Sequence, residues 1–136
     1  MRTAVLGAPS SEVEAMRDVV LQSLTAAIAA IRPGVTAGSV DQACRGVIEE
    51  AGFEAMFRKR TGYSIGVAFA PDWGEGHIVS LRKDDPTELV PGMVFHMPPA
   101  LRAFQRLCVG FSETVLVSES GCDVLTDHPR ALHIVG

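Results

Sequence analysis

The sequence predicts an α+β fold in which two helices pack on a mainly antiparallel sheet. Two amphipathic patterns with helical spacing fill residues 11–52, and short β-branched and aromatic segments follow residue 62. Strands that follow one another across turns, without alternating with helices, favour antiparallel pairing. A single domain fits 136 residues, and a hydrophobic content of 47% is enough to build its core.

Two helices are expected in the first 52 residues. In the first, apolar residues recur at steps of three and four and form the face Val13, Met16, Val20, Leu24, Ile28 and Ile31. Ser11 and Glu14 have the spacing of a capping box at its start, and residues 33–34 (Pro-Gly) predict its end. Ser39 is the expected cap of the second helix, and Gly52 its expected left-handed C-terminal residue. The second helix has the apolar face Val40, Cys44, Val47 and Ile48.

The remaining sequence predicts strands separated by turns. Extended segments are expected at residues 63–69, 78–81, 93–97, 108–118 and 122–125. Residues 119–121 (Glu-Ser-Gly) predict a hairpin, so the last two segments are expected to pair.

Composition and charge exclude several classes of function. The net charge is −4 with no run of like charges, which disfavours nucleic acid or an anionic membrane as partner. The chain has no apolar stretch of about 18 residues and no secretory pattern at its start. Its cysteines, Cys44, Cys108 and Cys122, lack metal-site spacing and are odd in number, which is typical of a reducing cytoplasm.

One histidine lies inside an apolar strand segment. By alternation His96 shares a face with Val94, opposite Phe95 and Met97. A polar group in such a run needs a partner, so His96 is either a satisfied core residue or a functional one. None of the four histidines has the helical spacing of a zinc motif, and His128 and His133 are expected at the surface.

Two further places carry polar groups in unusual surroundings. Residues 70–77 combine Asp72, Trp73 and Glu75 with proline and glycine, which suits a small cationic or zwitterionic ligand but also an ordinary turn. Glu113 lies among β-branched residues, where a carboxylate is costly unless it is paired or used. It is therefore either functional or placed on an exposed sheet face.

Four motifs, in order along nearly the whole chain, resemble the creatinase/aminopeptidase-P/methionine-aminopeptidase superfamily. Residues 30–36 resemble its "aikPGvt" turn, and residues 60–66 its "R-x-G-H-G-I-G" strand. Residues 89–95 resemble "L-x-P-G-M-v-f", and residues 112–118 resemble "E-D-T-v-l-V-T". The resemblance implies a pita-bread fold, of which residues 1–136 would be the C-terminal half of the catalytic domain.

Metallopeptidases of this superfamily bind two metal ions through two Asp, one His and two Glu. When the motifs are aligned, Tyr63, Pro98 and Ser112 stand at metal-ligand positions of the superfamily. Ala70 stands at the position of a catalytic histidine. Glu113 stands where the superfamily has Asp. Such side chains do not supply the imidazole and carboxylates of a dinuclear site, so we expect no metal and no other cofactor.

The variant motifs at residues 62–66, 71–75 and 95–96 resemble the metal-free branch that includes ectoine hydrolase. That resemblance implies hydrolysis of a C–N bond in a small zwitterionic or cyclic amidine or amide substrate. We expect Glu113 and His96 in acid–base roles and Tyr63 as a hydrogen-bond donor. Asp72, Trp73 and Glu75 are the expected substrate-binding residues.

Two alternatives follow from the same residues. A half-domain exposes an unpaired sheet edge and an apolar face, so the chain is expected to form a homodimer or to bind a complementary half, with or without catalysis. A dimetal aminopeptidase is the third hypothesis, and the substitutions at Tyr63, Pro98 and Ser112 argue against it.

Overall fold

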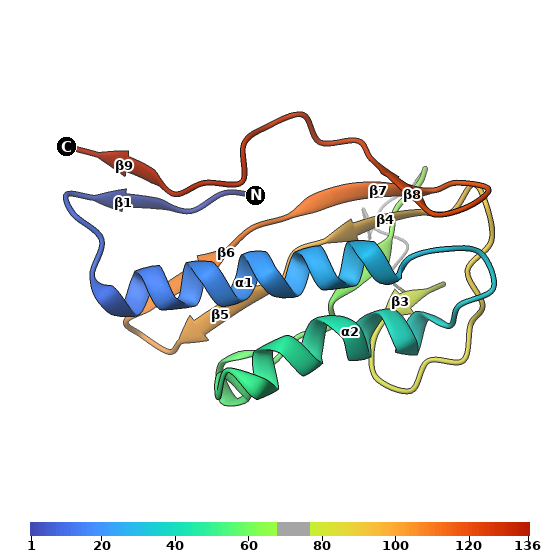
Figure 1. The fold of residues 1–136 in the computed structure, drawn as a ribbon, viewed down its shortest axis with the longest axis horizontal. Helices are drawn as coiled ribbons and strands as arrows, with labels where there is room; N and C mark the ends of the chain where they lie inside the picture. Colours follow the sequence, from blue (N-terminus) through green and yellow to red (C-terminus); the bar gives the residue numbers. More distant parts are fainter. Residues whose placement is uncertain (68–76) are drawn as a thin grey trace.

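The computed structural model describes residues 1–67 and 77–136, and in it two helices lie against the sheets (Figure 1). The helices are α1 (Ser11–Ala30), α2 (Ala37–Glu50) and the short 3-10 helix η1 (Glu54–Met56). The strands are β1 (Ala4–Leu6), β2 (Gly62–Ser64), β3 (Ser80–Leu81), β4 (Val94–Met97), β5 (Ala100–Ala103), β6 (Leu107–Gly110), β7 (Glu113–Val117), β8 (Cys122–Val124) and β9 (His133–Val135). This order of elements confirms the predicted α+β class.

Both helices occur where their apolar faces predict them, but both begin earlier than expected. Ser10, not Ser11, caps α1, and its hydroxyl accepts from the Val13 N–H at 3.3 Å. Thr36, not Ser39, caps α2, with its hydroxyl accepting from the Ser39 N–H at 3.2 Å. The start of α2 is set by tertiary contacts, because the first backbone N–H groups of the helix donate to carbonyls of residues 85 and 87. Gly52 has φ +76°, as its C-terminal position predicts.

The central sheet has five antiparallel strands in the order β3-β2-β4-β7-β8. The predicted hairpin at residues 119–121 is confirmed, since β7 pairs with β8 across it. The expected strand at 93–97 is also confirmed as β4. Of the segment expected at 63–69, β2 covers the beginning, and residues 68–69 lie outside the described residues.

The segment expected as one strand at 108–118 is two strands, β6 and β7. β5 and β6 form a separate antiparallel pair that continues the β4–β7 ribbon past a break. The break lies opposite residues 98–99 (Pro-Pro), which have no backbone N–H to donate to a partner strand. Proline therefore interrupts pairing on both strands, although only one of them contains it.

The two ends of the chain lie side by side. β1 and β9 pair in parallel, with Ala4 opposite His133 and Leu6 opposite Val135, as Figure 1 shows near the N and C labels. Sequence patterns did not predict this pair, because both strands are short and almost wholly exposed. The segment between β8 and β9 crosses toward the start of β7, and residues 126–135 are called the strap below.

A single core joins the helices to one face of the central sheet. Alternate residues of β4 and β7 point into it, among them Phe95, Met97, Val115 and Val117, where they pack with the buried faces of α1 and α2. The intervening residues, including His96 and Thr114, are half-buried on the other face. Neither described helix is long and apolar enough to cross a membrane.

Candidate functional site

The sheet face turned away from the helices brings together two of the predicted catalytic residues. In the register of the central sheet Tyr63 of β2 lies opposite His96 of β4, which lies opposite Thr114 of β7. Directly opposed residues of antiparallel strands project from the same face. Tyr63, His96 and Thr114 therefore form one row across three strands, which we call the His96 row.

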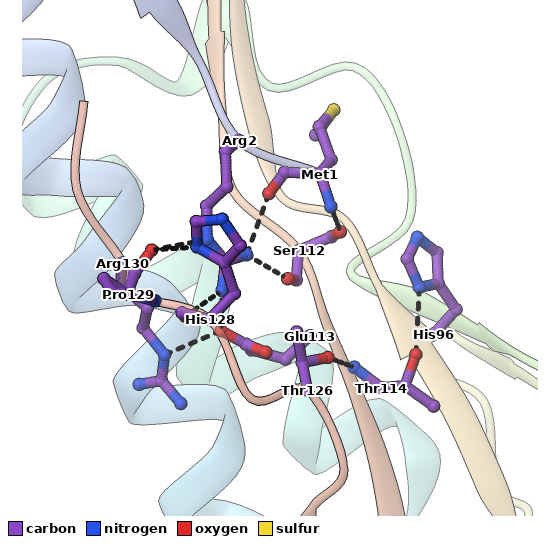
Figure 2. Close-up of polar contacts among 10 residues, drawn as sticks. All are labelled: Met1, Arg2, His96, Ser112, Glu113, Thr114, Thr126, His128, Pro129 and Arg130. Atoms are coloured by element: carbon purple, nitrogen blue, oxygen red, sulfur yellow. Dashed lines mark hydrogen bonds and ion pairs between the residues drawn. The ribbon is translucent and has the colours of Figure 1, made fainter. Parts of the chain in front are cut away.

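Aromatic and polar contacts fix the imidazole in this row. The Tyr63 and His96 rings meet edge to face, with centroids 5.5 Å apart and an interplanar angle of 63°. On its other side His96 Nδ1 lies 3.5 Å from Thr114 Oγ1 (Figure 2). The Arg60 guanidinium stacks over the Tyr63 ring at 4.9 Å from its centroid. The row therefore presents a phenol and an imidazole beside a cation.

The surroundings of His96 favour its neutral form. Burial lowers the pKa of His96, the positive Met1 amino group lowers it further, and the Glu113 carboxylate opposes both. Burial is the largest of these influences, because a charged imidazole loses hydration in a half-buried position. At neutral pH the imidazole can thus accept a proton.

The structure does not bring Glu113 into the His96 row. Glu113 lies opposite Met97 and faces the core side of the sheet, where it is 1% exposed. Its Oε1 accepts from Arg2 Nη2 and from Arg130 Nε, both at 2.9 Å. In Figure 2 its side chain points toward these two arginines, whereas Thr114 and His96 lie to the other side. The alternative from the sequence, an exposed sheet-face position, is wrong, because Glu113 is buried.

Some site predictions fall outside the described part of the chain, and the sequence missed other residues. Asp72, Trp73 and Glu75 lie outside the described residues. Thr114 was missed, although strand alternation places it on the His96 face once the register is known. Arg2 and Arg130 were missed because no local pattern links them to residue 113.

A groove lies away from the His96 row, beside α2. This groove of about 620 Å³ runs between α2 and residues 83–86. Its walls are mostly polar and charged: Thr36, Ser39, Asp41, Gln42, Arg45, Glu49, Lys83, Asp84 and Asp85. It contains none of the predicted site residues.

Comparison with known families decides the relationship. The sequence profile of metallopeptidase family M24 matches residues 1–119. The chain belongs to this family. Ectoine hydrolase of Halomonas elongata is 35% identical over 133 residues, which are 98% of this chain and 33% of that protein. The probable dipeptidase PepE of Mycobacterium bovis is 36% identical over 134 residues, covering 98% and 34% of the two chains.

Solved structures agree with the fold. Dipeptidase PepE from Mycobacterium ulcerans superposes with a TM-score of 0.90 at 32% identity, covering 98% of this chain and 34% of that one. X-Pro aminopeptidase from Thermotoga maritima gives a TM-score of 0.89 at 28% identity, covering 98% and 36%. The M24 chain thus spans about a third of the length of the relatives it matches, and its helices and antiparallel sheets match theirs.

The family name implies a metal ion, and the described residues do not fit one. In residues 1–67 and 77–136 no three His, Cys, Asp or Glu side chains come together as metal ligands. The His96 row offers one imidazole between a phenol and an alcohol, without a carboxylate. Hydrolytic metal sites of this kind use several imidazole or carboxylate donors, so we derive no step through a metal.

Proposed function

We propose that this M24 chain forms part of a hydrolase that cleaves a C–N bond in a small zwitterionic or cyclic amidine or amide substrate, without a metal ion. The observation that carries the proposal is the His96 row, in which a neutral imidazole and a phenol share one sheet face, without a metal-binding donor set among residues 1–67 and 77–136. The similarity to ectoine hydrolase supports the substrate class.

In the proposed reaction His96 takes a proton from water as the water oxygen adds to the amidine or amide carbon. The Tyr63 hydroxyl donates a hydrogen bond to the charge that develops on the substrate, and Arg60 over the Tyr63 ring favours that role. The C–N bond then breaks, and the proton carried by His96 passes to the leaving nitrogen. We assign Glu113 no contact with the substrate, because its carboxylate lies on the opposite face.

For substrate binding we propose Asp72, Trp73 and Glu75. An indole face and two carboxylates suit the cationic part of a zwitterion through cation–π and ion-pair contacts. Replacing Trp73 by Ala is expected to raise KM about tenfold while leaving kcat close to wild type.

The test is turnover by the purified 136-residue chain, with ectoine and with a Xaa-Pro dipeptide as separate substrates. NMR of the product identifies the bond that breaks, and elemental analysis and a chelator measure dependence on metal. His96→Gln and Tyr63→Phe are each expected to lower kcat by about 100-fold or more, whereas the matched control His133→Gln, in the exposed strand β9, leaves it unchanged.

The outcomes separate the hypotheses. Turnover of ectoine that survives the chelator supports the proposal. Turnover of the dipeptide that stops with the chelator overturns it in favour of a dimetal aminopeptidase. Saturable ectoine binding without turnover, or neither binding nor turnover, overturns catalysis by this chain alone.

A non-catalytic unit that pairs with a second copy or a complementary chain is the second candidate. The observation that favours it is the number of large apolar side chains left in solvent, including Leu6 at 86%, Val67 at 80% and Phe104 at 80% exposure. Light scattering during size exclusion measures the solution mass. A discrete dimer without turnover selects this candidate, and a catalytically active monomer removes it.

A further inference from the structure

The buried Glu113 carboxylate is held in an unusual way. It sits on the apolar side of β7, and its Oε1 accepts from both arginines. The other oxygen, Oε2, is buried without a hydrogen-bond partner among the described residues. A carboxylate in such a place is unstable unless opposite charges neutralise it, so Arg2 and Arg130 are what keep it there.

Arg2 uses its whole guanidinium at this point. Each of its five N–H groups has an acceptor in Figure 2: Glu113 Oε1 and the carbonyl oxygens of Met1, Ser112, His128 and Pro129. Arg2 precedes β1, Ser112 precedes β7, and residues 128–129 belong to the strap. The arginine thus joins three segments around Glu113, and Arg130 adds a second bond from the strap.

The next residue along β7, Thr114, is held by residues 125–126, where the strap begins. The Thr114 N–H donates to Thr126 Oγ1 at 3.0 Å, and the Thr114 carbonyl accepts from the Leu125 N–H at 2.8 Å. The backbone of Thr114 is thereby hydrogen-bonded to residues 125–126, while the side chain of the preceding residue, Glu113, is bonded to Arg2 and Arg130. What remains free to act is the Thr114 hydroxyl, which faces His96 Nδ1.

We propose that Glu113, clamped between Arg2 and Arg130, is a positioning residue that holds Thr114 so that its hydroxyl accepts from His96 Nδ1–H. A neutral imidazole carries one N–H, so a proton fixed on Nδ1 leaves the Nε2 lone pair available to accept a proton. The catalytic consequence rests on the proposed function, in which His96 is the base. Glu113 then acts from the opposite face, through backbone geometry and through its charge.

The charges around His96 agree with such coupling. Its pKa responds to burial, to the Met1 amino group and to the Glu113 carboxylate, and only the last of these raises it. Across β2, Arg60 lies over the Tyr63 ring that contacts the imidazole. Removing the Glu113 charge is therefore expected to lower the pKa of His96 further.

The test uses imidazole ¹H–¹⁵N NMR spectra of the 136-residue chain, which report the protonated nitrogen of His96 without any substrate. In the wild type we expect His96 to carry its proton on Nδ1. Thr114→Val is expected to move a measurable fraction to Nε2, and Thr114→Ser, which keeps the hydroxyl, to restore the wild-type spectrum. Glu113→Gln is expected to shift the same resonances and to lower the pKa of His96.

A matched control separates positioning from general loss of stability. Asp85→Asn breaks another buried carboxylate–arginine pair, with Arg82 and outside the His96 row, and is expected to leave the His96 resonances in place. If Glu113→Gln does not fold, Arg130→Gln removes one of the two guanidiniums and is expected to shift the same His96 resonances, without lowering the pKa of His96, because a positive charge is lost.

An unchanged His96 spectrum in Thr114→Val overturns the proposal, and so does a shift in Asp85→Asn as large as that in Glu113→Gln or Arg130→Gln. These results are independent of turnover. If the spectra behave as expected but no substrate is consumed, only the proposed function fails. If His96 is required for turnover but the spectra do not respond, only the positioning role fails.

Discussion

Two buried carboxylates of this chain are paired with arginine in different ways. Asp41, on α2, accepts from Arg45 Nε at 2.9 Å and Nη2 at 3.2 Å, and from the Thr61 hydroxyl at 2.7 Å and N–H at 3.2 Å. Both of its oxygens therefore have partners. Glu113 accepts from two guanidiniums at one oxygen, and its other oxygen has no hydrogen-bond partner in residues 1–67 and 77–136. Each carboxylate is 1% exposed.

The difference concerns how far apart the partners are in sequence. Asp41 and Arg45 are one helical turn apart, and Thr61 follows soon after, so this cluster fastens α2 to the start of β2. Glu113 meets Arg2 across 111 residues and fastens β1 and the strap to β7. A satisfied local pair strengthens an element that already forms, whereas the long-range pair fastens distant segments to β7, beside Thr114 of the His96 row.

The largest effect is expected from Glu113→Gln. Loss of the carboxylate leaves the guanidiniums of Arg2 and Arg130 close together without a neutralising charge, and Arg2 is only 9% exposed. We expect the free energy of unfolding to fall by about 3–5 kcal/mol. Urea unfolding followed by circular dichroism measures it. A loss of only a few tenths of a kcal/mol would contradict this, because it would mean that the Glu113 ion pairs stabilise the fold no more than ordinary surface pairs do.

Asp41→Asn is expected to have a smaller effect, about 1–3 kcal/mol, because the asparagine oxygen still accepts a hydrogen bond from Thr61. Arg45 loses its partner but is 24% exposed and can be hydrated. The same unfolding experiment, with Arg45→Lys as the conservative control, tests this ranking. A loss greater than that of Glu113→Gln would reverse the comparison.

Gly62→Ala tests β2, which links the Asp41 cluster to the His96 row, because Gly62 follows Thr61 and precedes Tyr63. A methyl group at Gly62 would come within 2.9 Å of the His96 carbonyl oxygen, and backbone atoms give way poorly. We expect a loss of about 1–3 kcal/mol together with a shift of the Tyr63 and His96 resonances. Gly46→Ala on α2, where nothing lies within 4 Å of the added carbon, is the control and is expected to stabilise or to be neutral.

The smallest effect is a pH dependence that arises from His96, on the sheet face opposite Glu113. The pKa of folded His96 lies below its ordinary value of 6.5, so the unfolded chain binds the proton more readily. The contribution of His96 to stability is therefore complete above about pH 6.5 and falls as the pH drops toward the folded pKa, by at most about 1.4 kcal/mol per pH unit. Thermal unfolding between pH 7 and 5 measures this slope. His96→Gln should flatten it and His133→Gln should not; an equal slope in all three proteins contradicts the assignment.

Much of the fold could be predicted because its signals are local. The apolar spacing of residues 13–31 gave α1, and the alternation around His96 placed Phe95 and Met97 in the core. The helix caps were wrong by one and three residues because neighbouring hydroxyls compete, and contacts to residues 85 and 87 decided the second. The long strand at 108–118 was wrong because its break is caused by prolines on the opposite strand.

The site was predicted less completely, for the same reason. His96 and Tyr63 each stand out by residue type, and the structure places them in contact. Glu113 also stands out, but its direction depends on which residue opposes Met97, and that register is a property of the assembled sheet. Thr114 has no signal of its own until the sheet pairs it with His96.

By itself the sequence determined the two helices, the antiparallel strands, the absence of long charged runs and the residue types that can exchange protons. These features depend on spacing over a few residues, where backbone periodicity dictates which side chains share a face. Only the tertiary structure decided that Arg2 and Arg130 converge on Glu113 and that β1 pairs with β9. Such contacts join residues as far apart in the sequence as Ala4 and His133, and they form only when the core has brought those segments together.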